Sequence, residues 1–256
     1  SEIIGLVPER VLFESAKNHL LLRDFTPDQV LERQVARAMR ASDNAATAGG
    51  ATAGEFLEAI ASSDPVPGGG SVSAYAGALS AALTRMVAGL TIGRKKYASV
   101  EPEITIVAAN AEKLAVELSR LVDRDAEAYA AVSEAYKMPK EPAEAAELSE
   151  AAITKALLFA AEIPLETARR CADAAALAAT VAAKGNSNAV TDAGVAAMLA
   201  SAGCTGASFN VRINVGSLAD RSLGAHLERE AIELAEAAGK YSAEVCAIVE
   251  RALSPG

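Results

Sequence analysis

The sequence predicts an all-α protein, a multi-helical bundle of long antiparallel helices, and three observations support this fold class. Of the 256 residues, 51% are hydrophobic, yet only 4% are aromatic and none is Trp. Alanine is abundant, so we expect a core of Ala, Leu, Val and Ile in which helices pack at short distances. Several long segments place apolar residues every three or four positions, and turns containing Pro or Gly separate these segments.

The first 54 residues are predicted to lie outside the bundle. Residues 1–40 contain Pro8 and a short helical pattern, followed by TPDQ at 26–29, which is typical of a helix cap and first turn. Residues 41–54, ASDNAATAGGATAG, are small and polar, with nothing to bury. We therefore expect a flexible linker at 41–54 between an N-terminal part and a helical domain at 55–256.

Within the helical domain, Pro and Gly turns set the expected boundaries of the helices. Pro164 is expected to kink or divide one long helix. Thr191 and Asp192 are candidate caps for the helix that follows the turn at 185–188. The other expected helices cover 54–62, 71–92, 102–136, 143–183 and 219–253.

One segment, SFNVRINVGSL at 208–218, does not follow the helical pattern. Phe209, Val211, Ile213 and Val215 alternate with other residues, which is the period of a strand. The local pattern leaves strand and helix equally open.

Charge and composition exclude several classes of protein. The net charge of −9 argues against a nucleic-acid-binding protein, because no overall positive field would attract phosphates. The segment 72–92 is long enough to cross a membrane, but Arg85 and several hydroxyl groups favour a buried helix of a soluble protein.

Cysteine spacing and the N-terminal sequence favour the cytoplasm. Cys171, Cys204 and Cys246 match no metal or disulfide pattern, which favours a reducing compartment. Residues 1–25 lack the features of a signal peptide.

The sharpest candidate site residue is Asp125. It lies on a seam whose members alternate at steps of four and three: Val107, Ala111, Leu114, Leu118, Leu121, Asp125, Ala128 and Val132. Asp123 and Glu127 point away from this seam. A carboxylate on an apolar seam is costly unless it is paired or functional, and both explanations stay open. Burial would raise its pKa, the condition in which it could donate a proton near neutral pH.

Two further motifs flank the helix at 71–92. The turn PVPGGGS, with Gly68, Gly69, Gly70 and Ser71, lets a ligand approach the backbone, or serves only for close packing. It matches neither a Walker loop nor GxGxxG. At the other end, the cations Arg94–Lys96 (Arg94, Lys95 and Lys96) either stabilise a helix C-terminus or bind carboxylates.

Polar residues in two later segments complete the set of candidates, namely Asn186, Asn188, Asp192, Asn210 and Asn214. Each is weak evidence alone, since Asn and Asp are ordinary turn and cap residues. His19 and His226 suggest no metal site or triad, so a carboxylate is the expected proton carrier.

Seven motifs in this order carry a family resemblance: DPVPGGGSVSA, LTIGRKKY, LVDRDAEAY, MPK, IPLETA, GNSNAVTDAGVAA and GASFNVRINVGSL. Over about 55–253 the chain resembles the formiminotetrahydrofolate cyclodeaminase family, which includes methenyltetrahydrofolate cyclohydrolases. Residues 1–35 look like the tail of a glutamate formiminotransferase domain whose catalytic body is absent. The chain is therefore either a fragment or a cyclodeaminase with a transferase remnant, without transferase activity of its own.

The resemblance implies a helical homodimer, or a higher oligomer, with its active site near the subunit contact, and a helix at 208–218. The family's catalytic aspartate falls on Asp125. The implied substrate is a tetrahydrofolate derivative, with no tightly bound cofactor. We expect the glycine turn and asparagines such as Asn186 and Asn210 to hold the pterin, and Arg94–Lys96 to hold the glutamate tail, which is polyglutamylated in some folates.

The implied reaction converts 5-formiminotetrahydrofolate to 5,10-methenyltetrahydrofolate and ammonia, in histidine degradation and one-carbon metabolism. A glutamate formiminotransferase would supply the substrate. The alternatives are a methenyltetrahydrofolate cyclohydrolase and a non-catalytic module for folate binding or oligomerisation.

Overall fold

The computed structural model of the chain describes residues 15, 19 and 52–254. The chain divides into two units, Ser1–Gly50 and Ala51–Gly256, and the fold described below belongs to the second. The prediction for 1–40 and most of the predicted linker lie outside the described residues. The end of that linker is different from the prediction, because Thr52 caps helix α3 (Ala53–Ile60) in a capping box with Glu55.

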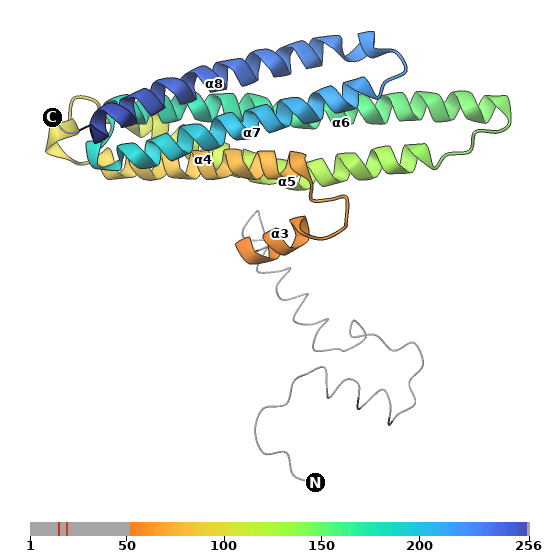
Figure 1. Ribbon diagram of the computed structural model, residues 1–256, viewed down its shortest axis with the longest axis horizontal. Coiled ribbons are helices and arrows are strands. Elements are labelled where there is room, and N and C mark those ends of the chain that lie inside the picture. The colour runs from red at the N-terminus through yellow and green to blue at the C-terminus, as the bar shows by residue number, and fades with distance from the viewer. Residues whose placement is uncertain (1–14, 16–18, 20–51, 255–256) are drawn as a thin grey trace. The chain divides into compact units, whose positions relative to one another are not determined.

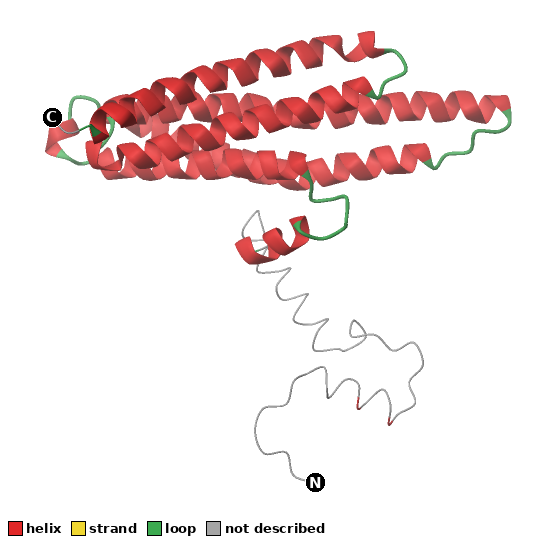
Figure 2. Cartoon of the chain, in the orientation of Figure 1, coloured by secondary structure: helices red, strands yellow, loops and turns green. Residues whose placement is uncertain are grey.

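The fold is all-α, as predicted, and Figure 2 shows only helices and loops in the described part of the chain. Five long helices run side by side (Figure 1). They are α4 (Gly69–Thr91), α5 (Glu101–Tyr136), α6 (Ala143–Lys184), α7 (Val190–Gly216) and α8 (Ala225–Leu253). Short 3₁₀ helices lie in three of the connections, at η2 (Lys95–Tyr97), η3 (Ser187–Ala189) and η4 (Arg221–Gly224).

Helix α6 lies at the centre of the bundle. Helix α6 packs against α4, α5, α7 and α8, and α4 packs against α5, α6 and α7. Small residues allow this close approach: a Cβ atom at Gly77 of α4 would clash with Cys171 of α6 and Leu118 of α5. The core is therefore built largely from Ala, Val and Leu, as the composition predicted.

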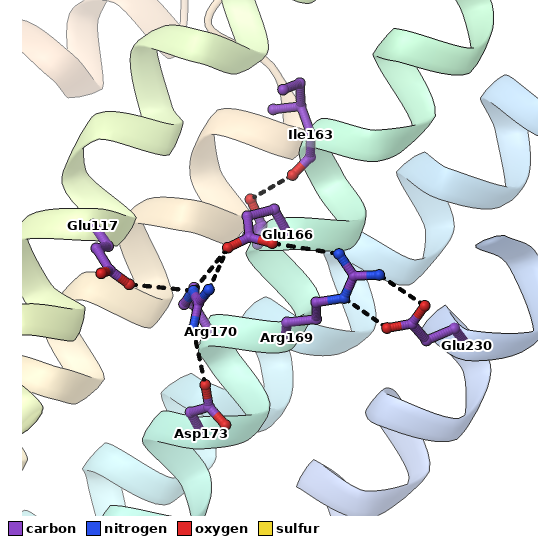
Figure 3. Close-up of polar contacts among 8 residues, drawn as sticks. Glu117, Ile163, Glu166, Arg169, Arg170, Asp173 and Glu230 are labelled. Atoms are coloured by element: carbon purple, nitrogen blue, oxygen red, sulfur yellow. Dashed lines mark hydrogen bonds and ion pairs between the residues drawn. The ribbon is translucent and has the colours of Figure 1, made fainter.

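Ion pairs connect the three helices α5, α6 and α8 (Figure 3). Arg170 of α6 pairs with Glu117 of α5, at 3.2 Å, and with Glu166 of its own helix, at 2.6 Å. Arg169 binds both carboxylate oxygens of Glu230 of α8, at 2.6 and 2.8 Å. These side chains are partly exposed, so each pair alone contributes little to the free energy of unfolding. Together the pairs favour the packing of these faces of α5, α6 and α8 against one another.

The structure decides three expectations about the helices. Pro164 does not divide its helix, since α6 continues through it. The helix that the family resemblance implied at 208–218 is confirmed as the end of α7, and the strand that the local alternation left open does not form. Thr191 and Asp192 are not caps, because α7 begins at Val190 and both lie in its first turn. Among the described residues, no helix is long and apolar enough to cross a membrane.

Candidate active site

A cavity of about 320 Å³ lies where α4 begins, between α5, α6 and α7. The glycine turn forms one wall, and Asp125 with Tyr129 of α5 forms another. Asn210 and Asn214 of α7 complete it, so the structure brings together six predicted site residues, namely the three glycines of the turn, Asp125, Asn210 and Asn214. The other lining residues are Pro65, Val66, Ala128, Val132, Tyr136, Leu157, Ala160, Ile213 and Ser217.

Asp125 lies on the half-buried edge of the α5 seam. Its neighbours on the seam, Leu121 and Ala128, are buried, whereas Asp123 and Glu127 are exposed. Burial raises the pKa of the Asp125 carboxyl, and hydrogen bonds from Ser71 oppose this rise. The carboxyl therefore holds a proton at higher pH than an ordinary aspartate.

Ser71 and Gly70 fix the position of that carboxyl from the first turn of α4. The Ser71 hydroxyl donates to Oδ2 of Asp125 at 2.9 Å and lies 3.2 Å from the carbonyl oxygen of Val122. Gly70 lies directly against the carboxylate, and a Cβ atom built on it would overlap both carboxylate oxygens. The third glycine of the turn is thus required for Asp125 to occupy this place.

The start of α4 also leaves backbone donors facing this region. Gly68 is the N-cap residue and offers no side chain to cap the helix. The first N–H groups of a helix have no partner within the helix, so those of Gly69 and Gly70 are available to a polar ligand.

The two asparagines of α7 line the cavity, and each bonds a backbone carbonyl. Asn210 donates its amide hydrogen to the carbonyl oxygen of Gly206 at 2.8 Å. Asn214 donates to the carbonyl oxygen of Ala160 at 2.7 Å. Each Oδ1 atom has no hydrogen-bond partner among the described residues, so it can accept from a ligand that carries N–H donors, and each amide nitrogen keeps a second N–H.

The bond from Asn214 also explains how α6 tolerates Pro164. Proline has no N–H, so the carbonyl of Ala160, four residues earlier, loses its helical partner. Asn214 from α7 supplies the missing donor. The same bond therefore replaces the hydrogen bond lost at Pro164 and joins two residues of the cavity wall, Asn214 and Ala160.

The other predicted site residues lie at the opposite end of α4. Arg94 is the N-cap residue of η2, and Lys95 and Lys96 lie within that helix. Helix α4 has 23 residues, so about 33 Å separates this end from the glycine turn. A single chain does not bring the Arg94–Lys96 cluster to the Asp125 cavity.

Asn186 and Asn188 lie at that same end and hold the backbone there. Asn186 donates to the carbonyl oxygen of Leu90, at 3.0 Å, and accepts from the N–H of Asn188. Both ends of its amide are therefore engaged, contrary to the expectation that it orients a ligand beside Asp125. Asp192, in the first turn of α7, is also remote from the cavity.

A tyrosine completes this remote cluster. The backbone N–H of Ser187 donates to the Tyr97 hydroxyl at 2.9 Å, and the two hydroxyls lie 3.2 Å apart. The Ser187 side chain and backbone lower the pKa of Tyr97 to about 8.

The sequence interpretation missed several residues that line the cavity. Tyr129 is four residues after Asp125 on α5, so helical spacing could have placed it on the same side. Tyr136 ends α5, Leu157 lies in α6 and Ser217 directly follows α7, and no local pattern indicated that they meet.

The arrangement suits proton transfer to a flat polar ligand. It combines a carboxyl of raised pKa with backbone donors and amide acceptors on facing walls. Among the described residues, no group of His, Cys, Asp and Glu is arranged to hold a metal ion.

Comparisons with known proteins place these features in one family. Residues 52–233 match the family model described as formiminotransferase-cyclodeaminase. The chain is 40% identical over 198 residues to a methenyltetrahydrofolate cyclohydrolase of Methylorubrum extorquens, covering 77% of this chain and 95% of that protein. It is 27% identical to a formimidoyltransferase-cyclodeaminase of Gallus gallus, over 98% of this chain and 50% of that protein.

A mouse formimidoyltransferase-cyclodeaminase is 29% identical, over 86% of this chain and 44% of that protein. The chain thus spans about half the length of the chicken and mouse relatives. Among solved structures, a formiminotetrahydrofolate cyclodeaminase of Thermotoga maritima is similar, with a TM-score of 0.71 and 30% identity. That likeness covers 78% of this chain and 96% of the other.

Proposed function

The chain belongs to the formiminotransferase-cyclodeaminase family, and we propose that it converts 5-formiminotetrahydrofolate to 5,10-methenyltetrahydrofolate and ammonia. The observation that carries this proposal is the Asp125 carboxyl, whose pKa is raised by burial and which Ser71 holds at the cavity wall. A raised pKa favours this role, because the reaction needs a group that can donate a proton.

In the proposed reaction, N10 of the substrate attacks the formimino carbon, and its proton moves to the formimino nitrogen. This step gives a tetrahedral aminal in which the former formimino nitrogen is an amino group. Asp125 donates its proton to that amino group, the carbon–nitrogen bond breaks, and ammonia leaves. The carboxylate that remains lies beside the methenyl cation and stabilises it by charge attraction.

The cavity walls suit the pterin part of the substrate. Its ring edge carries N–H and amino donors, which match the free Oδ1 atoms of Asn210 and Asn214. Its carbonyl oxygen matches the free backbone N–H groups at the start of α4. We therefore assign pterin binding to the glycine turn and the α7 asparagines.

Two observations support the cyclodeaminase over other reactions. The similarity to the chicken formimidoyltransferase-cyclodeaminase covers 98% of this chain, whereas that to the cyclohydrolase covers 77%. The wider coverage agrees with the resemblance of the N-terminal residues to the end of a formiminotransferase domain. A glutamate formiminotransferase would then supply the substrate.

The second candidate is methenyltetrahydrofolate cyclohydrolase, in which water opens the methenyl ring to give the 10-formyl product. The 40% identity to the Methylorubrum protein favours it, because the three cyclodeaminases above, from chicken, mouse and Thermotoga, are 27%, 29% and 30% identical. The same carboxyl would serve either reaction. A non-catalytic module is less well supported, because it would not need an aspartate in this position.

An exposed apolar face supports the proposal of a homodimer. Along α4 its exposed members are Val72, Leu79, Met86 and Leu90, and along α7 they are Val195, Met198, Phe209 and Ile213. The two helices pack against each other, and we infer that these rows form one apolar surface, the kind of surface that marks interaction sites. We assign this surface, the α4–α7 face, to a second copy of the chain.

A two-fold axis near the middle of α4 would also give the Arg94–Lys96 cluster a role. It would bring the partner's cluster toward the glycine-turn end of this α4, because the axis reverses the helix direction. The cluster could then bind the outer residues of a polyglutamate tail. Met86→Glu should convert the dimer to a monomer in sedimentation experiments, and an unchanged mass would contradict this face as the contact.

The proposed reaction is tested by adding the purified chain to 5-formiminotetrahydrofolate and, separately, to 5,10-methenyltetrahydrofolate. Methenyl absorbance and ammonia are followed together. Ammonia that appears in step with methenyl absorbance supports the cyclodeaminase. Loss of methenyl absorbance with no reaction of the formimino substrate would identify a cyclohydrolase, and no change with either would leave a binding module.

A further inference from the structure

A second cavity, of about 370 Å³, adjoins the Asp125 cavity. It lies between the end of α5, the start of α6 and the end of α7, and it contains Lys140 from the loop between α5 and α6. Three residues line both cavities: Tyr136, Leu157 and Ser217. The two cavities therefore adjoin along a shared wall and offer one extended binding region.

We propose that Lys140 binds a carboxylate of the first glutamate of the substrate, while the pterin lies beside Asp125. This inference rests on the proposed function, since it concerns the other end of the same substrate. It gives a role to the MPK segment, which the pterin site does not use. It also separates the first glutamate from the outer glutamates assigned to the Arg94–Lys96 cluster.

The spacing of the two cavities suits a ligand of this shape. From Asp125 to Tyr136 the chain advances 11 residues along α5, which is about 16 Å, and Lys140 follows in the loop. A pterin, a benzoyl ring and a glutamate laid end to end extend over a comparable distance. The aromatic ring of Tyr136 and the aliphatic side chain of Leu157 lie at the junction, where they can pack against the benzoyl ring.

Charge singles out Lys140 within this region. Among the described residues that line the two cavities, Lys140 is the only cation, and no ion pair joins it to another of them. Glu150 lines the same second cavity and repels anions, so a carboxylate is favoured only on the Lys140 side. The second carboxylate of the glutamate would then point to solvent.

A buried hydroxyl provides a second, independent indication of a ligand. Ser149 lines the second cavity, is 2% exposed, and its Oγ has no hydrogen-bond partner among the described residues. Buried hydroxyls are normally hydrogen-bonded. When the ligand fills the cavity, we expect the amide carbonyl that links the benzoyl ring to the glutamate to accept a hydrogen bond from Ser149.

The test uses Lys140→Gln, which removes the charge and keeps most of the side chain. Lys137→Gln is the matched control, because Lys137 is in the same loop region but pairs with Glu134 at 2.6 Å and lines neither cavity. The probes are 5-formyltetrahydrofolate and 5-formyltetrahydropteroate, which lacks the glutamate. Binding of both is measured by calorimetry with the full chain.

We expect Lys140→Gln to weaken binding of 5-formyltetrahydrofolate about 5-fold, the scale of one partly exposed ion pair. Binding of the pteroate should not change, and Lys137→Gln should change neither. In turnover, KM should rise while kcat stays within about 2-fold. Lys140→Glu should weaken binding further, because it places like charges together.

The proposal is overturned if Lys140→Gln weakens both ligands equally, or weakens neither, or if Lys137→Gln has the same effect. A wild-type chain that binds 5-formyltetrahydrofolate but turns over neither substrate would overturn the proposed reaction alone, because the Kd values still report on Lys140. A wild-type chain that binds neither probe would overturn both.

Discussion

The hydroxyl of Ser71 lies 2.9 Å from Oδ2 of Asp125 and 3.2 Å from the backbone carbonyl oxygen of Val122. A hydroxyl has one proton to donate and can also accept. When Asp125 is ionised, Ser71 donates to its carboxylate. When Asp125 is protonated, Ser71 can donate to Val122 and accept from the carboxyl. This contact therefore serves both protonation states that the proposed reaction requires.

Ser71→Ala should shift the pH dependence of kcat to higher pH. Hydrogen bonds from Ser71 lower the pKa of Asp125, so their loss lets burial raise that pKa further. The reaction needs protonated Asp125, so the alkaline limb of the profile moves up. Ser73→Ala is the control, because its hydroxyl bonds the carbonyl of Gly69 and not Asp125. If Ser71→Ala and wild type had the same pH dependence of kcat, Asp125 would not be the proton donor in the rate-determining step.

Gly70→Ala should displace the Asp125 carboxyl, because the added methyl group would overlap it. We expect a loss of about 1–3 kcal/mol in the free energy of unfolding and a sharp fall in kcat. Gly89→Ala, in the same helix, is the control, since a Cβ atom there meets nothing within 4 Å. That control should stabilise the chain by about 0.5–1 kcal/mol. Urea unfolding measures both, and a fully active Gly70→Ala would contradict the assigned position of Asp125.

Asn214→Ala should destabilise the chain by about 1–3 kcal/mol, because it leaves the carbonyl of Ala160 without a donor. In a Pro164→Ala background the same change should cost much less. Residue 164 then has an N–H group that can bond that carbonyl within α6. Urea unfolding of the two single variants and the double variant gives the coupling between the sites. Additive effects would show that the two residues do not share this carbonyl.

Glu230→Gln should destabilise the chain by about 1 kcal/mol or less at neutral pH, since the pair with Arg169 is partly exposed. The hydrogen bonds from Arg169 hold the pKa of Glu230 below its ordinary value. Its contribution is therefore present above the ordinary glutamate pKa and is lost as pH falls through the depressed value. Urea unfolding at neutral and acid pH should show the difference disappear in acid. A difference that persists there would assign the effect to packing.

The sequence predicted those features that depend on a single helix. The spacing along 107–132 was enough to place Asp125 between buried neighbours, and α5 has that seam. The apolar alternation at 208–218 has the period of a strand, although the segment is helical, because both sides of α7 are apolar there. Val211 and Val215 face the core, whereas Phe209 and Ile213 lie on the exposed α4–α7 face. A helix that is apolar on two faces carries no clear helical period.

Features that depend on contacts between helices could not be predicted in the same way. Pro164 signalled a break, but the donor that replaces its missing N–H comes from Asn214, 50 positions later. The residue types of the Arg94–Lys96 cluster and of the glycine turn suggested that both bind the same ligand. The two motifs lie at opposite ends of one helix. The length of α4 places them about 33 Å apart in one chain.

The most direct test of the account is a single-turnover measurement of ammonia release from 5-formiminotetrahydrofolate by wild type and Asp125→Asn. The variant keeps the shape of the side chain, and its fold and its Kd for 5-formyltetrahydrofolate are checked first. We predict that wild type releases ammonia in step with methenyl formation, and that the variant binds but reacts about 10²–10⁴-fold more slowly. Release by the variant at the wild-type rate would contradict the role of Asp125 as proton donor.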